Sequence, residues 1–177
     1  FYAIKGLAFL DGARFVNTGY ADQLAREDMF DVDWDDLDSA SIKYYFRLVK
    51  DMDRRHKEYF FNNTNGSLGP DSISNEERVL NNSIAQAFCS KGCVTRCTFC
   101  HRFNKGIRII PPDIVIARIK KLIECFNVGV VLFCDECFGA SSKWLKEFCE
   151  LIKPLNILWK VGGMRVSQVS PDIIKMM

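Results

Sequence analysis

The chain has 177 residues, of which 48% are hydrophobic and 26% charged, and its formal net charge is +2. This composition is that of an ordinary globular domain and excludes a disordered or fibrous segment. The longest apolar run, near residues 128–134, is far shorter than the roughly 20 residues that a bilayer span needs. No secretory signal opens the sequence, so we expect a cytoplasmic protein without a membrane span.

The net charge hides an asymmetry, since residues 1–84 carry a charge of −5 and residues 85–177 one of +7. A basic half is compatible with nucleic acid or with a phosphate- or carboxylate-bearing ligand. Its lysines are spread along helix-like stretches rather than clustered. This favours a solvated basic face, and we expect no nucleic-acid partner.

The first predicted element is a β-hairpin. Two apolar-rich runs, residues 7–10 and 14–17, lie on either side of Asp11-Gly12. That dipeptide tolerates the positive φ angles that a tight hairpin turn requires.

An acidic segment and a loop follow the hairpin. The acidic residues surround Trp34 and end at Asp38-Ser39, which are typical helix caps and predict a helix through Lys50. Residues 62–75 are rich in Asn, Ser and Gly and are typical of a loop.

From residue 84 onward, short apolar runs alternate with helix-like stretches. The apolar run at residues 128–134 is continuous, which is typical of a strand in a parallel sheet that is covered on both faces. Alternation of this kind predicts a parallel α/β sheet with right-handed crossovers. We expect strands at 84–89, 128–134 and 157–161. We also expect a helix that opens at Pro111-Pro112 and carries an apolar stripe as far as Phe126, a second from about 142 to 153 and a third that starts at Pro171.

All eight cysteines lie in the second half of the chain, which without a secretory signal favours metal binding or redox chemistry over disulfides. Cys93, Cys97 and Cys100 are spaced CxxxCxxC in the stretch CSKGCVTRCTFCHR. The same spacing occurs on a helix face, but Gly92 and two threonines disfavour a helix, and basic neighbours favour thiolates. Structural zinc sites use four ligands, whereas a cubane held by three thiolates leaves one iron open, so the motif favours an iron-sulfur cluster.

This motif resembles the hallmark of the radical S-adenosylmethionine (radical SAM) superfamily, including the aromatic residue before the last cysteine, here Phe99. The resemblance implies that Cys93, Cys97 and Cys100 bind a 4Fe-4S cluster. It also implies that the open iron binds S-adenosylmethionine, with Phe99 beside the adenine.

The resemblance covers nearly the whole chain and is closest to members that carry an N-terminal cobalamin-binding domain. It implies a partial (β/α) barrel of about three strand-helix units over residues 84–177, and a linker over residues 1–83 that follows a missing cobalamin domain. We therefore expect a fragment of a longer protein. The matching stretches are IKGLAFLDGARFVN, DVDWDDLDSASIKYYF, CHRFNKGIRIIPPDIVIARIKKLI, VGVVLFCDECFG and WKVGGMRVSQVSPDIIKMM.

Two acids and an arginine are further candidates for cofactor binding. Asp135 and Glu136 follow the second strand, where the family's Gly-Gly-Glu element accepts the S-adenosylmethionine ammonium; both glycines are missing here, and the choice between the acids stays open. The carboxyl ends of parallel strands are where such folds bind ligands. Arg165 follows the third strand and is a candidate partner for a carboxylate, with a surface role as the alternative.

The resemblance implies reductive cleavage of S-adenosylmethionine to a 5′-deoxyadenosyl radical, followed by methyl transfer, cyclisation or rearrangement of a small-molecule substrate that the sequence does not identify. It also implies an electron donor such as flavodoxin or ferredoxin. Cobalamin is expected in the full-length protein only, since the family's Asp-x-His-x-x-Gly signature is absent from this chain.

The alternative function is a non-catalytic zinc-binding module built from Cys97-x2-Cys100 and Cys134-x2-Cys137. The 33 residues between the two pairs are many for a zinc ribbon or finger. The role of Cys137 stays open. Core positions are expected for the remaining cysteines: Cys89, Cys125, Cys134 and Cys149.

Overall fold

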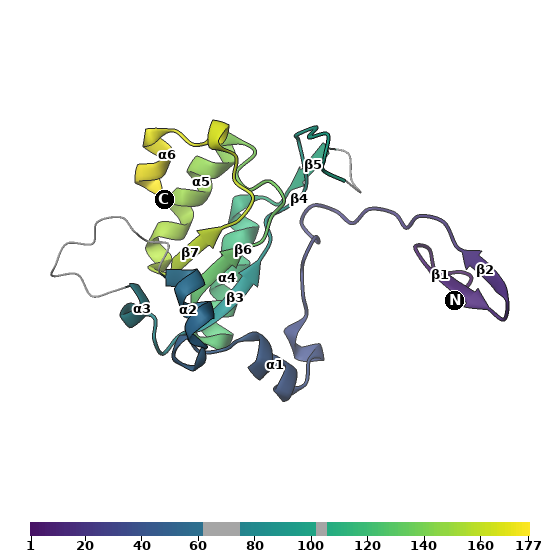
Figure 1. Ribbon diagram of the computed structural model, residues 1–177, viewed down its shortest axis with the longest axis horizontal. Coiled ribbons are helices and arrows are strands. Elements are labelled where there is room, and N and C mark those ends of the chain that lie inside the picture. The colour runs from purple at the N-terminus through teal and green to yellow at the C-terminus, as the bar shows by residue number, and fades with distance from the viewer. Residues whose placement is uncertain (62–74, 102–105) are drawn as a thin grey trace.

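The computed structural model of the chain describes residues 1–61, 75–101 and 106–177. Its centre is a parallel sheet in the order β3-β6-β7 (Figure 1), made of β3 (Ser83–Ala87), β6 (Val128–Phe133) and β7 (Leu158–Val161). Two antiparallel pairs, β1-β2 and β4-β5, lie outside this sheet. The other elements are β1 (Ala8–Asp11), β2 (Arg14–Asn17), α1 (Ser39–Tyr45), α2 (Arg54–Phe61), α3 (Asn75–Arg78), β4 (Ser90–Cys93), β5 (Gly106–Ile109), α4 (Pro112–Phe126), α5 (Ser142–Ile152) and α6 (Pro171–Met176).

The three strands and three helices expected after residue 84 are present, with bounds that differ by at most two residues in the strands. β3 and β7 each pair with β6 in parallel. The apolar run of β6 is almost wholly buried, because side chains from both faces of the sheet are covered. The partial barrel, and the division of the chain at residue 84, stay predictions.

Helices α4 and α5 cover one face of the sheet. α4 begins at Pro112, where the missing backbone N–H removes no helical hydrogen bond. The predicted stripe of α4, including Val115 and Ile119, is buried against Phe133 of β6 and Phe148 of α5. No helix among the described residues is long and apolar enough to cross a membrane.

Among the described residues, the opposite face of the sheet is covered only near the amino ends of its strands. The covering residues and the strand residues beneath them form a small cluster: Val49, Phe61, Val79, Ile84 and Val130. Because strand side chains alternate between faces, Gln86 and Leu132 continue this face toward the carboxyl ends. Gln86 is exposed and Leu132 is half-buried, so this face is open at the carboxyl end of the sheet.

The helix expected over residues 38–50 is shorter than predicted. Asp38 caps it as expected, since its carboxylate accepts two backbone amide hydrogen bonds of the first turn. α1 nevertheless ends at Tyr45. The chain then runs along the free edge of β3, where the Arg47 carbonyl accepts a 3.0 Å hydrogen bond from the Ile84 amide. Pairing with a distant strand edge, which helical periodicity does not reveal, replaces the predicted last turn.

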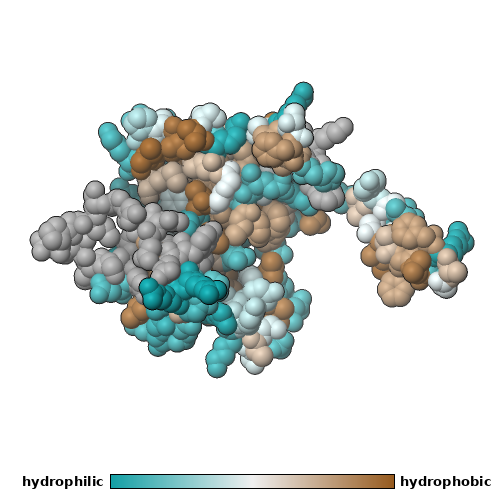
Figure 2. Space-filling model, viewed as in Figure 1, coloured by the Kyte–Doolittle hydropathy of each residue, from teal (hydrophilic) through white to brown (hydrophobic). Residues whose placement is uncertain are grey.

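The expected hairpin is confirmed as β1-β2, and its turn lies one residue later than predicted. Asp11 pairs with Arg14, and Gly12 has a φ of 59°, as the first central residue of a type II′ turn requires. Figure 1 shows the hairpin apart from the central sheet, and Figure 2 shows hydrophobic side chains gathered on it. Among these, Leu10 and Phe15 are exposed.

The cysteine segment begins with a strand that the sequence analysis did not predict. β4 pairs antiparallel with β5, and Cys93 is its last residue. Gly92 has a φ of 91°, and a Cβ atom there would lie 2.4 Å from the Gly106 carbonyl oxygen. Only glycine allows this close approach, and the same glycine hid the strand from sequence reasoning. The loop expected over residues 62–75 lies, apart from Asn75, outside the described residues.

Truncation of Phe148 tests the core. This side chain is fully buried. Its ring centroid lies 4.9 Å from that of Trp144 and 5.4 Å from that of Phe133. Phe148→Ala is expected to lower the free energy of unfolding by about 3–5 kcal/mol, measured by urea denaturation. Lys146→Ala, exposed on the same helix, should change it by less than about 0.5 kcal/mol, and equal losses would contradict this core.

Candidate metal and cofactor site

The segments that follow the three parallel strands meet at the carboxyl end of the sheet. The Gly162 amide donates to the Phe133 carbonyl at 2.9 Å, and the Cys134 amide donates to the Ala87 carbonyl at 3.0 Å. Gly163 has a φ of 67°, and a Cβ there would lie 2.3 Å from the Asp135 carbonyl oxygen. The turn after β6 and the turn after β7 are therefore in backbone contact.

Asp135 is buried beneath the start of β4. One carboxylate oxygen, Oδ1, accepts hydrogen bonds from the Ser90 amide at 2.5 Å, the Ser90 hydroxyl at 2.6 Å and the Cys89 amide at 3.1 Å. Burial, together with this carboxylate, raises the pKa of the Cys89 thiol. The other oxygen, Oδ2, is buried without a hydrogen-bond partner among the described residues. Asp135 thus ties the end of β6 to the start of the cysteine segment.

Glu136 differs from its neighbour in being exposed. Its carboxylate is therefore accessible to a ligand from solvent. Asp135, at 4% exposure, is closed to such a ligand. The structure therefore separates two acids that the sequence left equivalent.

Cys93 lies where β4 ends and is half-buried. Its sulfur is 3.2 Å from the Thr95 hydroxyl and accepts a 3.4 Å hydrogen bond from the Thr95 amide. These bonds to Thr95 lower the pKa of the Cys93 thiol, and hydrogen bonding to Cys137 and the positive charge of Arg165 lower it further. A thiol with a lowered pKa ionises more readily to the thiolate, which is the form that binds metal.

Cys97 and Cys100 lie on the exposed part of the same segment. The Cys100 amide donates to the Cys97 carbonyl at 3.2 Å, which makes a tight turn, and Phe99 between them is 91% exposed. In residues 1–61, 75–101 and 106–177, no three His, Cys, Asp or Glu side chains lie close enough to share one metal ion. The donor chemistry fits an iron-sulfur cluster, because three cysteine thiols occur within eight residues of one segment.

Burial of the other cysteines agrees only in part with expectation. Cys89 and Cys149 are buried, as predicted. The prediction for Cys125 was wrong, because this residue is exposed on the side of α4 away from the apolar stripe. Cys134 is half-buried, and it is Cys137, left open by the sequence, that is fully buried.

Arg165 reaches the same region from the segment after β7. Its backbone amide donates to the Gln168 side-chain oxygen at 3.2 Å. Its charge acts on the Cys93 thiol, and its Nε is buried without a hydrogen-bond partner in the described part of the chain. A buried guanidinium nitrogen without a partner is a donor suited to a carboxylate ligand.

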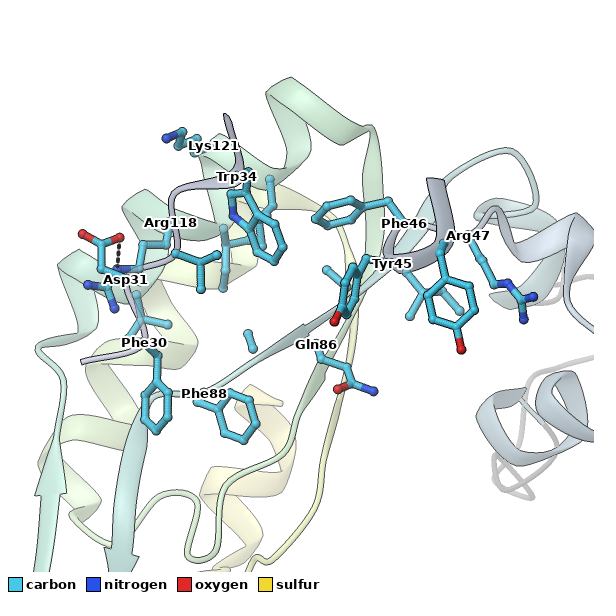
Figure 3. A pocket seen from close by; sticks show the side chains of 18 of the residues that line it. Phe30, Asp31, Trp34, Tyr45, Phe46, Arg47, Gln86, Phe88, Arg118 and Lys121 are labelled. Atoms are coloured by element: carbon cyan, nitrogen blue, oxygen red, sulfur yellow. Dashed lines mark ion pairs between the residues drawn. The ribbon is translucent and has the colours of Figure 1, made fainter. Parts of the chain in front are cut away.

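A pocket of about 490 Å³ lies beside the free edge of β3, and sequence reasoning missed it. Figure 3 shows its aromatic walls, including Trp34, and Phe30 and Phe88 facing each other, with ring centroids 4.8 Å apart. In the same wall, Arg118 of α4 forms a 3.4 Å ion pair with Asp31. The lining residues come from the linker, β3 and α4, and none comes from the cysteine segment.

The described residues form an α/β protein with three cysteine thiols, an exposed carboxylate and an arginine in the segments that follow its parallel strands, at the end of the sheet where open α/β folds bind ligands. No family model matches the chain. The chain is 27% identical over 175 residues to the anaerobic magnesium-protoporphyrin IX monomethyl ester cyclase of Cereibacter sphaeroides.

The match covers 96% of this chain, and the chain spans 23% of the length of that cyclase. Similarity to an enzyme over almost the whole chain supports the radical SAM resemblance at the level of the superfamily. The individual site residues and the reaction stay predictions.

The contrast between the two acids yields a stability test. Asp135→Ala would remove the acceptor of four hydrogen bonds and leave two buried amides unsatisfied. The expected loss is about 1.5–3 kcal/mol in the free energy of unfolding, measured by chemical denaturation. The control, Glu136→Ala, should stay within about 0.5 kcal/mol of the parent because the side chain is exposed. A larger loss from Glu136→Ala would overturn the assignment.

Proposed function

We propose that this chain contains the first part of a radical SAM domain, in which Cys93, Cys97 and Cys100 hold a 4Fe-4S cluster. The observation that carries the proposal is the position of three cysteine thiols on the segment after β3, at the carboxyl end of a parallel sheet. Open α/β folds bind ligands at that end. The similarity to an anaerobic cyclase also supports it, because a cluster with an open iron is sensitive to oxygen.

The bound cluster would supply the electron that cleaves S-adenosylmethionine to methionine and a 5′-deoxyadenosyl radical. The residues of the chain would bind and orient S-adenosylmethionine. Glu136 is the proposed acceptor for the ammonium, since it is the exposed acid, and Asp135 holds β4 in place. Arg165 is the proposed partner of the carboxylate, and the exposed ring of Phe99 is available to the adenine.

The proposal extends to the whole protein of which this chain is a part. The relative is a cyclase, which favours cyclisation over methyl transfer or rearrangement. An electron donor such as flavodoxin or ferredoxin would reduce the cluster. Cobalamin would bind to a domain that precedes the linker, because this chain lacks the histidine signature.

Cluster reconstitution tests the three ligands. After anaerobic incubation with iron and sulfide, the chain is expected to bind one 4Fe-4S cluster with broad absorbance near 400 nm. Alanine at Cys93, Cys97 or Cys100 should abolish most of this absorbance, since each change removes one ligand. Cys125→Ala is the matched control, because this thiol is also exposed but lies on α4.

Two outcomes would contradict the assignment. Equal losses from Cys125→Ala and from the motif variants would show that the absorbance does not report a site at the motif. Colourless protein with stoichiometric zinc after anaerobic purification would favour the zinc-binding module instead.

Binding of S-adenosylmethionine tests the choice of Glu136. Glu136→Gln is expected to weaken binding to the reconstituted chain about ten- to a hundredfold, which corresponds to one lost charged hydrogen bond. Cluster absorbance should not change, because the ammonium partner acts on the ligand and not on iron. Isothermal titration measures the affinity, with Glu150→Gln, exposed on α5, as the control. Unchanged affinity in Glu136→Gln would refute the role.

A further inference from the structure

Cys93 and Cys137 are in side-chain contact, although 43 residues of the chain separate them. Their thiols are hydrogen-bonded to each other. The Cys137 sulfur also accepts from the Val94 amide and from the Gln168 side-chain amide, at 3.9 Å. The buried sulfur of the turn after β6 therefore lies directly against the end of β4.

The two thiols differ in access to solvent. Cys93 is half-buried, whereas Cys137 has no exposed surface. A small thiol-reactive molecule therefore reacts with Cys93 first. Cys137, which is hydrogen-bonded to Cys93, can then attack a mixed disulfide formed there. A disulfide bond is about 2.05 Å long, so two thiols already in contact need only a small approach to form one.

We propose that Cys93 and Cys137 form a reversible disulfide when Cys93 holds no metal, with a low-molecular-weight disulfide as the oxidant. The Cys93 thiolate attacks one sulfur of oxidised glutathione, forms a mixed disulfide and releases one glutathione thiolate. Cys137 then attacks the Cys93 sulfur and passes its proton to the departing glutathione thiolate, which leaves as the second glutathione thiol. Two protein thiols are oxidised to one disulfide, and one glutathione disulfide is reduced to two thiols.

The consequence of this bond rests on the proposed function. If Cys93 is a cluster ligand, the disulfide withdraws it from iron until a thiol reductant restores it. It also keeps Cys93 from over-oxidation to sulfinic acid, which is irreversible. The bond itself does not depend on a cluster, so its test uses the cluster-free chain.

The test is peptide mapping after oxidation. The 177-residue chain without metal is incubated with oxidised glutathione, alkylated and digested with trypsin and then with an enzyme that cleaves after glutamate. Trypsin isolates Cys93 in residues 92–96 and places Cys97 with Cys100 in residues 97–102. Cleavage after Glu136 separates Cys134 from Cys137. Residues 125–136 still carry both Cys125 and Cys134, so fragmentation of the linked peptides in the mass spectrometer identifies the cysteine in each pair.

The expected product is the peptide of residues 92–96 linked to that of residues 137–143. Dithiothreitol should remove the link, Cys137→Ser should abolish it, and Cys134→Ser should leave it unchanged. Far-UV circular dichroism tests whether both variants are folded. If Cys137→Ser does not fold, the link found in the parent chain still supports the pair. A bridge only between Cys97 and Cys100, or a link from Cys93 to Cys134, would overturn the proposal.

Discussion

The carboxylate of Asp135 is the interaction on which the candidate site depends. Its Oδ1 accepts from two successive backbone amides and from the Ser90 hydroxyl. A buried carboxylate is costly unless it is hydrogen-bonded, so the turn after β6 and the start of β4 are stable only together. β4 carries Cys93 at its end, and the position of the first cysteine thus follows from an acid 42 residues later in the chain.

A second constraint joins the turn after β7 to the same unit. Gly163 lies so close to the Asp135 carbonyl oxygen that any side chain would clash, and its φ of 67° is one that other residues rarely adopt. This close approach brings the segment of Arg165 beside Cys93 and Cys137. Three segments far apart in the sequence therefore meet through backbone contacts, and the charged and thiol side chains are placed by them.

The sequence predicted the regular elements well because their signals are local. The stripe of α4 and the apolar run of β6 report burial directly. The sequence analysis did not predict β4 and left the environment of Cys137 open, because both features depend on contacts between distant segments. β4 contains Gly92, which disfavours a strand prediction, and β4 is defined by its pairing with β5. Cys137 is buried because its turn packs against β4, and a turn has no periodic sequence pattern that would indicate burial.

The same reasoning explains how two adjacent acids have different environments. Consecutive residues of an extended segment direct their side chains to opposite sides, so that Asp135 lies beneath β4 and Glu136 faces solvent. With Glu136 in its proposed role as the acid of the Gly-Gly-Glu element, Asp135 occupies the position of the second glycine. A side chain is compatible with that position here because β4 supplies its hydrogen-bond donors. The departure from the motif therefore adds a link to the cysteine segment and leaves the following acid available to a ligand.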